Sequence, residues 1–232
     1  MGKSDKLFHK RKAKTAAAHR RKRAARSPYD RVLIVCEGRK TEPDYFRALI
    51  DDLQLNTANI RIAENTAGSS PRNVVDFALS EYKKDQKAGK ETGEQYDRVY
   101  CVFDKDTHPT YRETLDIIRR EQQKGRRGCP VHAVTSVPCF EFWLLLHFAK
   151  TTKNFDTGHG SICANVITDL KKYIPAYEKG EMKKIYQLVK DRIPKAVARA
   201  KQVERHCESG GTDMPSTKVY TLVDYLQQLK TR

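Results

Sequence analysis

Three acidic residues follow two apolar segments of this sequence, and their positions predict a cation site. Glu37 comes directly after the apolar run "VLIVC" (32–36), and Asp104 and Asp106 end the segment "RVYCVFDKD" (98–106). Residues i and i+2 of an extended segment point to one side, so both aspartates can face the same crevice as Glu37 if the two segments form neighbouring strands. Converging carboxylates repel one another strongly unless a cation lies between them.

Each acidic motif also has an ordinary explanation. A Glu-Gly pair after a strand is usually a turn, and Asp-Lys-Asp is usually an exposed loop with hydrated charges. Their occurrence together after buried strands is far more specific than either alone. Mg²⁺ takes oxygen ligands and commonly uses one or two carboxylates together with substrate phosphate. We therefore take Glu37, Asp104 and Asp106 as candidate ligands of Mg²⁺ or Mn²⁺ and as candidate catalytic residues.

The alternation of segments predicts the α/β fold that would bring these residues together. Strand and helix patterns alternate four times in the first 150 residues, with strands expected at 31–36, 59–63, 98–106 and 130–136. Such alternation specifies a mostly parallel sheet with helices on both faces. Ligands of these sheets bind beyond the carboxyl ends of the strands, where the acids stand.

The remaining sequence divides the chain into three expected parts. Residues 1–28 form a basic arm, 29–150 the α/β domain, and 151–232 a helical region packed on the same core. Helices are expected in that region at 161–174, 182–193, 196–209 and 216–230. The polar stretch 83–97 is expected to be an exposed loop, and 139–150 to begin a helix.

The arm carries most of the formal net charge of +16. Residues 1–26 hold 11 Lys/Arg against one acid, a net of +10, which leaves +6 for the rest of the chain. Such a segment is typical of non-specific phosphate binding, although a hydrated tail or a targeting signal would look the same. The candidate nucleic-acid contacts are Arg11, Lys12, Arg20, Arg21, Lys22 and Arg23 in the arm, and Arg39, Lys40 and Lys105 beside the acids.

Several classes of protein are disfavoured by what the sequence lacks. No apolar run approaches the ~18–20 residues of a membrane-spanning helix, so we expect a soluble, cytoplasmic protein without a membrane partner. Six cysteines without a CxxC pair predict free thiols in a reducing compartment, and no cysteine–histidine pair has a second pair at zinc-ligand spacing. A phosphate-binding P-loop is absent, so ATP hydrolysis by this chain is not expected.

Glu141 is a fourth candidate for the site. It stands among Phe140, Phe142 and Trp143 at the start of a helix that follows the fourth strand. A buried carboxylate there would need a metal or a basic partner. The alternative is an acid that stabilises the helix N-terminus, and both readings remain open. His108, two residues beyond Asp106, is a weaker catalytic candidate.

Four motifs in the sequence resemble a known family. Glu-Gly after a first strand and Asp-x-Asp after a third resemble the TOPRIM domain shared by topoisomerases, bacterial primases and OLD-type nucleases. The motifs "VCEGRKTEPDYF", "VFDKDTH", "SVPCFEFWLLLHF" and "MPSTKVYTLV" look like one branch of it, the RloB/AbiLii proteins of bacterial phage defence by abortive infection. The resemblance spans roughly residues 30–228.

The resemblance implies a metal-dependent nuclease that cleaves RNA, such as tRNA, or DNA. Glu37 matches the strand-end glutamate, a general acid/base or metal ligand, while Asp104 and Asp106 match the metal-binding aspartates; the segment around Glu141 also matches. The resemblance further implies a toxin controlled by a separate ATPase partner. A non-catalytic nucleic-acid-binding or assembly subunit is the alternative. Val137 and Met214 stand at positions where the family usually has Asn. Either replacement could remove a contact to the substrate or to a residue that supports the site.

Overall fold

The structure is a computed structural model that describes residues 30–230 apart from 64, 67, 93–94, 107, 126–127, 157 and 159. The candidate contacts of the arm, Arg11, Lys12, Arg20, Arg21, Lys22 and Arg23, therefore lie outside the described residues. Their assignment to nucleic-acid binding stays a prediction.

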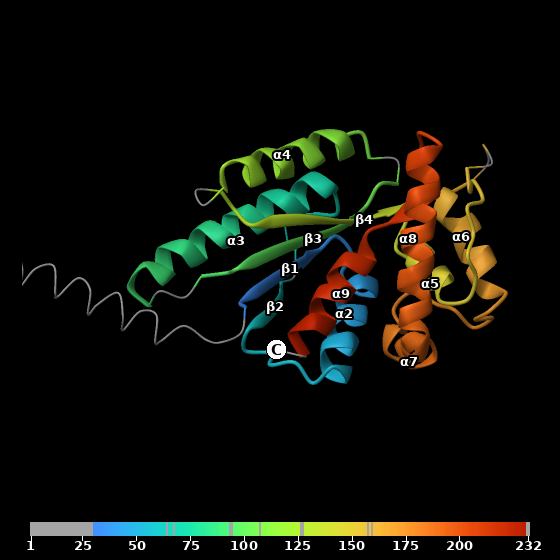
Figure 1. Cartoon of the computed structure of the whole chain (residues 1–232), viewed down its shortest axis with the longest axis horizontal. Helices are drawn as coiled ribbons and strands as arrows, with labels where there is room; N and C mark the ends of the chain where they lie inside the picture. The colour runs from blue at the N-terminus through green and yellow to red at the C-terminus, as the bar shows by residue number, and fades with distance from the viewer. Residues whose placement is uncertain are drawn as a thin grey trace, which may run out of the picture.

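A five-stranded sheet forms the centre of the molecule (Figure 1). Its strands are β1 (Val32–Cys36), β2 (Ile60–Ala63), β3 (Arg98–Asp104), β4 (Val131–Val137) and β5 (Ser216–Thr217). The order across the sheet is β2-β1-β3-β4-β5; the first four strands pair in parallel and β5 is antiparallel to β4. The predicted α/β class with a mostly parallel sheet is confirmed, and β1 and β3 are neighbours.

Helices cover both faces of the sheet, because its strands are apolar on both sides. Alternation along β1 sends Leu33 and Val35 into one core and Val32, Ile34 and Cys36 into the other. The first core lies under α3 (Pro71–Thr92) and α4 (Tyr111–Gln123). The helices of the second core are α2 (Thr41–Asp52), α5 (Glu141–Leu146), α6 (Ile162–Lys171), α7 (Met182–Val189), α8 (Ile193–Ser209) and α9 (Val219–Lys230).

The structure corrects several of the expected element boundaries. The strand expected at 98–106 ends at Asp104, so Asp106 lies beyond the extended segment from which its direction was predicted. The stretch 83–97 is not mainly a loop, because α3 continues to Thr92. Asp85 anchors this extension: its carboxylate accepts a hydrogen bond from the Tyr96 amide (2.8 Å) and lies 3.2 Å from the Arg31 guanidinium. The helix expected over 139–150 is limited to α5, and the last helix begins only at Val219, since Ser216 and Thr217 form β5.

The helical region shares a core with the α/β part of the chain. Buried residues of α6 to α9 pack in one cluster with those of α2 and α5. The region also returns a strand, β5, to the sheet. The division at residue 150 remains a prediction, although packing on a common core is observed. No helix in the described part of the chain is long and apolar enough to cross a membrane.

Two of the cysteines contradict the expectation of free thiols. Cys139 and Cys163 form a disulfide, with their Cα atoms 5.8 Å apart. The packing of α5 against α6 brings the two residues together across 24 positions of sequence, a proximity that spacing alone does not reveal. The remaining cysteines, Cys36, Cys101, Cys129 and Cys207, are free, as expected, and all four are buried.

His147 lies in the second core, and its burial leads us to expect that the protein loses stability in acid. It is fully buried, its Nδ1 lies 3.0 Å from the Trp143 carbonyl oxygen, and its Nε2 has no hydrogen-bond partner among the described residues. Burial lowers the pKa of His147 to about 4. The unfolded chain therefore takes up a proton near pH 6.5 that the folded chain resists, so stability falls as pH drops below that value.

We expect His147→Gln, which cannot ionise, to remove this dependence. Between pH 7.5 and 5 the free energy of unfolding of the wild type should fall by about 2 kcal/mol more than that of the variant. Urea unfolding of both proteins at the two pH values measures the difference. An equal fall in both proteins would contradict a neutral buried histidine.

Candidate functional site

A cavity of about 390 Å³ opens at the carboxyl ends of β1 and β3. It contains all four candidate carboxylates, together with residues that follow β1, begin α2 or lie before α7. Its lining is Glu37, Gly38, Arg39, Lys40, Thr41, Glu42, Ser69, Asp104, Asp106, His108, Phe140, Glu141, Lys179 and Gly180. Five carboxylates face three Lys/Arg side chains in this lining, so the cavity is acidic although the chain is strongly basic.

Glu37 is bound to the end of β3 because β1 and β3 are paired. Its amide donates to the Val102 carbonyl (2.9 Å), and its Oε2 accepts a hydrogen bond from the Asp104 amide (3.0 Å). The other oxygen, Oε1, lies 3.2 Å from Nε2 of His108. Burial raises the pKa of Glu37. The Asp104 amide and His108 lower this pKa, and the charge of Asp106 raises it. A carboxylate with a raised pKa can exchange protons close to neutral pH.

Asp104 has the most strongly perturbed carboxyl group of the cavity. Burial raises its pKa well above the usual value, and neighbouring carboxylates raise it further. Those neighbours are Glu42, Glu141 and Glu37. One oxygen, Oδ2, accepts a hydrogen bond from the Phe140 amide (3.2 Å), which orients the group between β3 and α5. Like charges gathered in this way are stabilised by a cation.

Glu42 belongs to the same cluster and was not predicted from the sequence. It lies in the first turn of α2 and is only 6% exposed. Burial raises the pKa of Glu42, backbone amides of Glu42 and Gly38 lower it, and the charges of Glu141 and Glu37 raise it. In the sequence it has the ordinary position of an acid at a helix N-terminus, so only its spatial neighbours distinguish it.

Gly38 is required by the position of the Glu42 side chain. A Cβ atom at residue 38 would lie 2.1 Å from Oε2 of Glu42 and 2.8 Å from its Cδ. These distances are far inside van der Waals contact. The Glu-Gly pair therefore supplies both a carboxylate and the empty space that a second carboxylate occupies.

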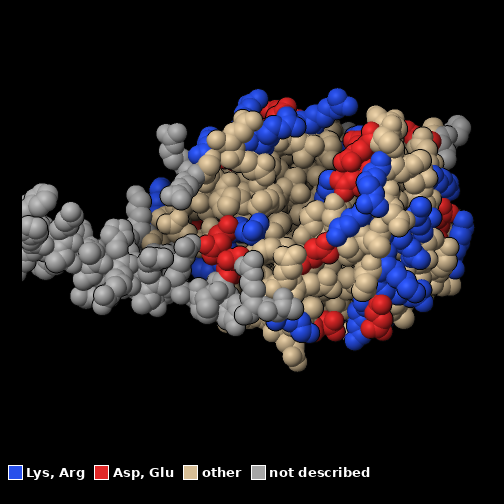
Figure 2. Space-filling model, in the orientation of Figure 1, with Lys and Arg blue, Asp and Glu red and all other residues tan. Residues whose placement is uncertain are grey.

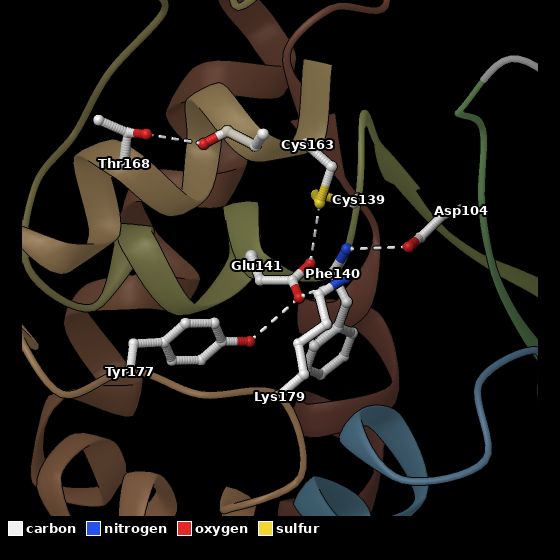
Figure 3. Close-up of a disulfide and its surroundings, with 9 residues drawn as sticks. Asp104, Cys139, Phe140, Glu141, Cys163, Thr168, Tyr177 and Lys179 are labelled. Atoms are coloured by element: carbon white, nitrogen blue, oxygen red, sulfur yellow. Dashed lines mark hydrogen bonds and ion pairs between the residues drawn. A yellow bond between two sulfur atoms is a disulfide. The ribbon is translucent and has the colours of Figure 1, made fainter. Parts of the chain in front are cut away.

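Glu141 is held by a basic partner, as its burial required. It is 2% exposed at the first residue of α5. The Tyr177 hydroxyl donates to Oε1 (3.0 Å), and Nζ of Lys179 lies 3.0 Å from the same atom (Figure 3). Cys163 Sγ lies 3.3 Å from Oε2. Glu141 therefore has an ion-pair partner without a metal, and Lys179, a second residue missed from the sequence, carries a positive charge into the cavity.

The remaining candidates differ in their relation to the cavity. Asp106 lines it in a left-handed backbone conformation (φ 35°), a geometry costly for a residue with a Cβ. Arg39 and Lys40 line it and are exposed. Lys105 does not line it; its Nζ lies 2.7 Å from Asp213.

The donor set of the cavity fits Mg²⁺ or Mn²⁺ in chemistry. The candidate ligands are all carboxylate oxygens, which these cations prefer. Oxygens of Glu37, Asp104 and Asp106 do not all lie within 4.8 Å of one another, however. Two carboxylates at a time, completed by water and phosphate, would match the usual coordination of Mg²⁺.

A different group is the one that meets this distance criterion within the described residues: Cys139, Glu141 and Cys163. Both of its sulfurs belong to the disulfide (Figure 3), so neither is a thiolate that could bind a metal. The cluster is therefore no evidence for a zinc site. The absence of such a site, expected from the sequence, remains a prediction.

Comparison with known families covers nearly all of the described fold. A sequence model of the family described as RloB-like protein matches residues 32–226, from the first residue of β1 into α9. The chain belongs to the RloB-like family. No curated protein and no solved structure matched the chain. The RloB-like match includes every residue of the acidic cavity and leaves the arm outside.

Proposed function

We propose that this RloB-like protein is a metal-dependent nuclease that hydrolyses phosphodiester bonds in the acidic cavity. The observation that carries the proposal is the position of the Asp104 carboxyl at the carboxyl end of β3, with its pKa raised by burial and by three other carboxylates. A cluster of this kind is unfavourable for the folded chain on its own and favourable once a cation is bound.

In this mechanism Asp104 and Asp106 would hold Mg²⁺ or Mn²⁺, together with Glu37 as a ligand or as the group that transfers a proton. A bound divalent ion would supply charge stabilisation at the scissile phosphate and a more acidic water. Glu37 accepts the proton of the attacking water, because its raised pKa and its contact with His108 suit proton transfer.

Phosphate binding is assigned to the basic residues around the acids. Lys179 enters the cavity beside Glu141, while Arg39 and Lys40 are exposed residues of its lining. The basic arm, net +10 over residues 1–26, would hold the nucleic acid non-specifically. Arg and Lys side chains beside an acidic metal site are the usual means of holding substrate phosphates while the metal acts on one of them.

The wider role that we infer is that of an effector of bacterial phage defence, acting on RNA such as tRNA or on DNA. Family membership and the motif resemblance support it. We also infer a separate ATPase partner, because the resemblance to the RloB/AbiLii proteins implies one; the lack of a P-loop in this sequence fits that division of labour. The alternative function is a non-catalytic nucleic-acid-binding or assembly subunit. The ion pair of Glu141 with Lys179 favours this alternative, because Glu141 then needs no metal to balance its charge.

A cleavage assay separates the two functions. Purified protein is incubated with labelled tRNA, single-stranded DNA and duplex DNA, in Mg²⁺, Mn²⁺ or EDTA, with and without an ATPase encoded beside it. We expect the wild type to cleave and EDTA to abolish the cleavage. The Glu37→Ala substitution should lower the cleavage rate at least about a hundredfold. Asp116→Ala, which removes an exposed carboxylate from α4, is the matched control and should cleave normally. If the protein binds nucleic acid but shows no metal-dependent cleavage under any of these conditions, the non-catalytic subunit is established instead.

A further inference from the structure

The outer edge of β4 is open along its first part. β5 pairs only with Ser136 and Val137, at the carboxyl end of the strand. Residues 131–135 of β4 therefore have β3 on one side and, among the described residues, no strand on the other. Folded proteins normally cover or block such an edge, because its unpaired backbone groups can bind another chain.

The hydrogen bonds on either side of β4 identify the groups that point outward. The carbonyls of Pro130 and Ser136 accept from Val99 and Lys105, at the side of β3. Carbonyls at odd positions point the other way: Val131 accepts from the Gln122 side chain (2.8 Å) and Thr135 from the Lys218 amide (2.7 Å).

Ala133 lies between these two outward positions. By the same alternation its N–H and C=O both point to the open edge. Neither has a partner among the hydrogen bonds of the described chain. Ala133 is half-buried and has neither the charge nor the proline with which edge strands are commonly protected.

A groove of about 860 Å³ lies over this edge, between α4 and α9. On the face shown in Figure 2 it is a hollow floored by uncharged residues, with both Lys/Arg and Asp/Glu side chains around it. Its lining includes Tyr100, Leu115, Ile118, Ala133, Tyr220 and Tyr225. Apolar and aromatic side chains on both sides of an open strand form the pockets into which alternate side chains of an added strand can insert.

The charge of the groove favours an acidic occupant. Among the described residues, four cations line it, Arg98, Arg119, Lys201 and Lys218, against one acid, Asp224. Burial and the charge of Arg98 lower the pKa of His132, which is therefore neutral at pH 7. Each cation also has an acidic neighbour within the protein, yet their side chains remain 39–67% exposed. The chain's own basic arm has the wrong charge to occupy this groove.

We propose that the open edge of β4 binds an extended acidic segment of a partner protein, which adds a strand to the sheet beside Ala133. Backbone hydrogen bonds to Ala133 would provide register, the apolar pockets would take alternate side chains, and Arg119 and Lys201 would contact the acidic ones. This site is separate from the acidic cavity, so it does not depend on nuclease activity.

The proposal is tested with a fluorescent heptapeptide of alternating Glu and Val added to the full-length protein, with fluorescence anisotropy as the readout. We expect saturable binding, and slower hydrogen exchange of the Ala133 amide on adding the peptide. Ala133→Pro removes the outward N–H and leaves the bonds to β3 intact, so binding should weaken about tenfold or more while the fold persists. Ala133→Ser keeps the amide and should bind as the wild type does.

Other results would overturn the proposal. Absence of binding, or equal affinity of the Ala133→Pro variant, excludes strand addition at this edge. Equal affinity for a Lys/Val peptide excludes an acidic partner. A dimer that Ala133→Pro abolishes would make a second copy of this chain the occupant. Displacement of the peptide by single-stranded DNA that still binds the Ala133→Pro variant would make the groove a nucleic-acid site.

Discussion

Replacing Asp104 by Asn is expected to lower the rate of hydrolysis at least about a thousandfold and to stabilise the metal-free protein. Asn keeps the shape of the side chain and can still accept the hydrogen bond from the Phe140 amide. It removes the charge that a metal needs, and it removes one of the like charges that destabilise the folded chain without metal. Activity and stability should therefore change in opposite directions.

The pH dependence of stability tests the same residue. A carboxyl with a raised pKa in the folded state binds its proton more tightly there than in the unfolded chain. In the absence of metal, stability is therefore lost as pH rises above about 4, through the folded pKa of Asp104. The Asp104→Asn variant should lose less stability than the wild type as pH rises over this range. Mg²⁺ should raise the melting temperature of the wild type more than that of the variant.

Thermal unfolding in EDTA and in Mg²⁺, between pH 5 and pH 8, measures these differences. Asp116→Asn, an exposed carboxylate on α4, is the control and should change neither the pH dependence nor the response to Mg²⁺. An Asp104→Asn protein that cleaves normally would remove Asp104 from the catalytic site. A variant that is less stable than the wild type in EDTA would contradict the repulsion described here.

Gly38→Ala is expected to lower activity about tenfold to a hundredfold and to reduce the free energy of unfolding by about 1–3 kcal/mol. The added Cβ would lie 2.1 Å from Oε2 of Glu42, so the buried carboxylate must leave its position next to Glu37 and Asp104. The backbone of Gly38 does not have the positive φ that alanine avoids, so the whole effect comes from this contact.

A double-mutant cycle isolates the contact. Glu42→Ala removes the atoms that collide, so Gly38→Ala should be nearly neutral for stability in that background, and urea unfolding of the four proteins gives the coupling energy. Gly210→Ala is the matched control, because a Cβ there has no neighbour closer than 3.4 Å and its backbone also lacks a positive φ. Additive effects of the two substitutions would show that Gly38 serves another purpose than space for Glu42.

The sequence by itself determined the class of fold and the edge of the sheet where the acids meet. Apolar runs such as Val32–Cys36, separated by helical patterns, leave few arrangements other than a parallel sheet. Carboxyl ends of adjacent parallel strands share one edge, so Glu37 and Asp104 had to be close once β1 and β3 were neighbours.

The tertiary structure alone decided which other side chains complete the cavity. Glu42 and Lys179 have local surroundings that indicate only a helix terminus and an exposed loop. What distinguishes both is their proximity to Glu141, which is distant from each in sequence. The disulfide of Cys139 with Cys163 and the strand at Ser216–Thr217 likewise depend on how α5, α6 and α8 pack. Local sequence patterns encode periodicity and chain ends, whereas these contacts are set by packing between segments that no local pattern connects.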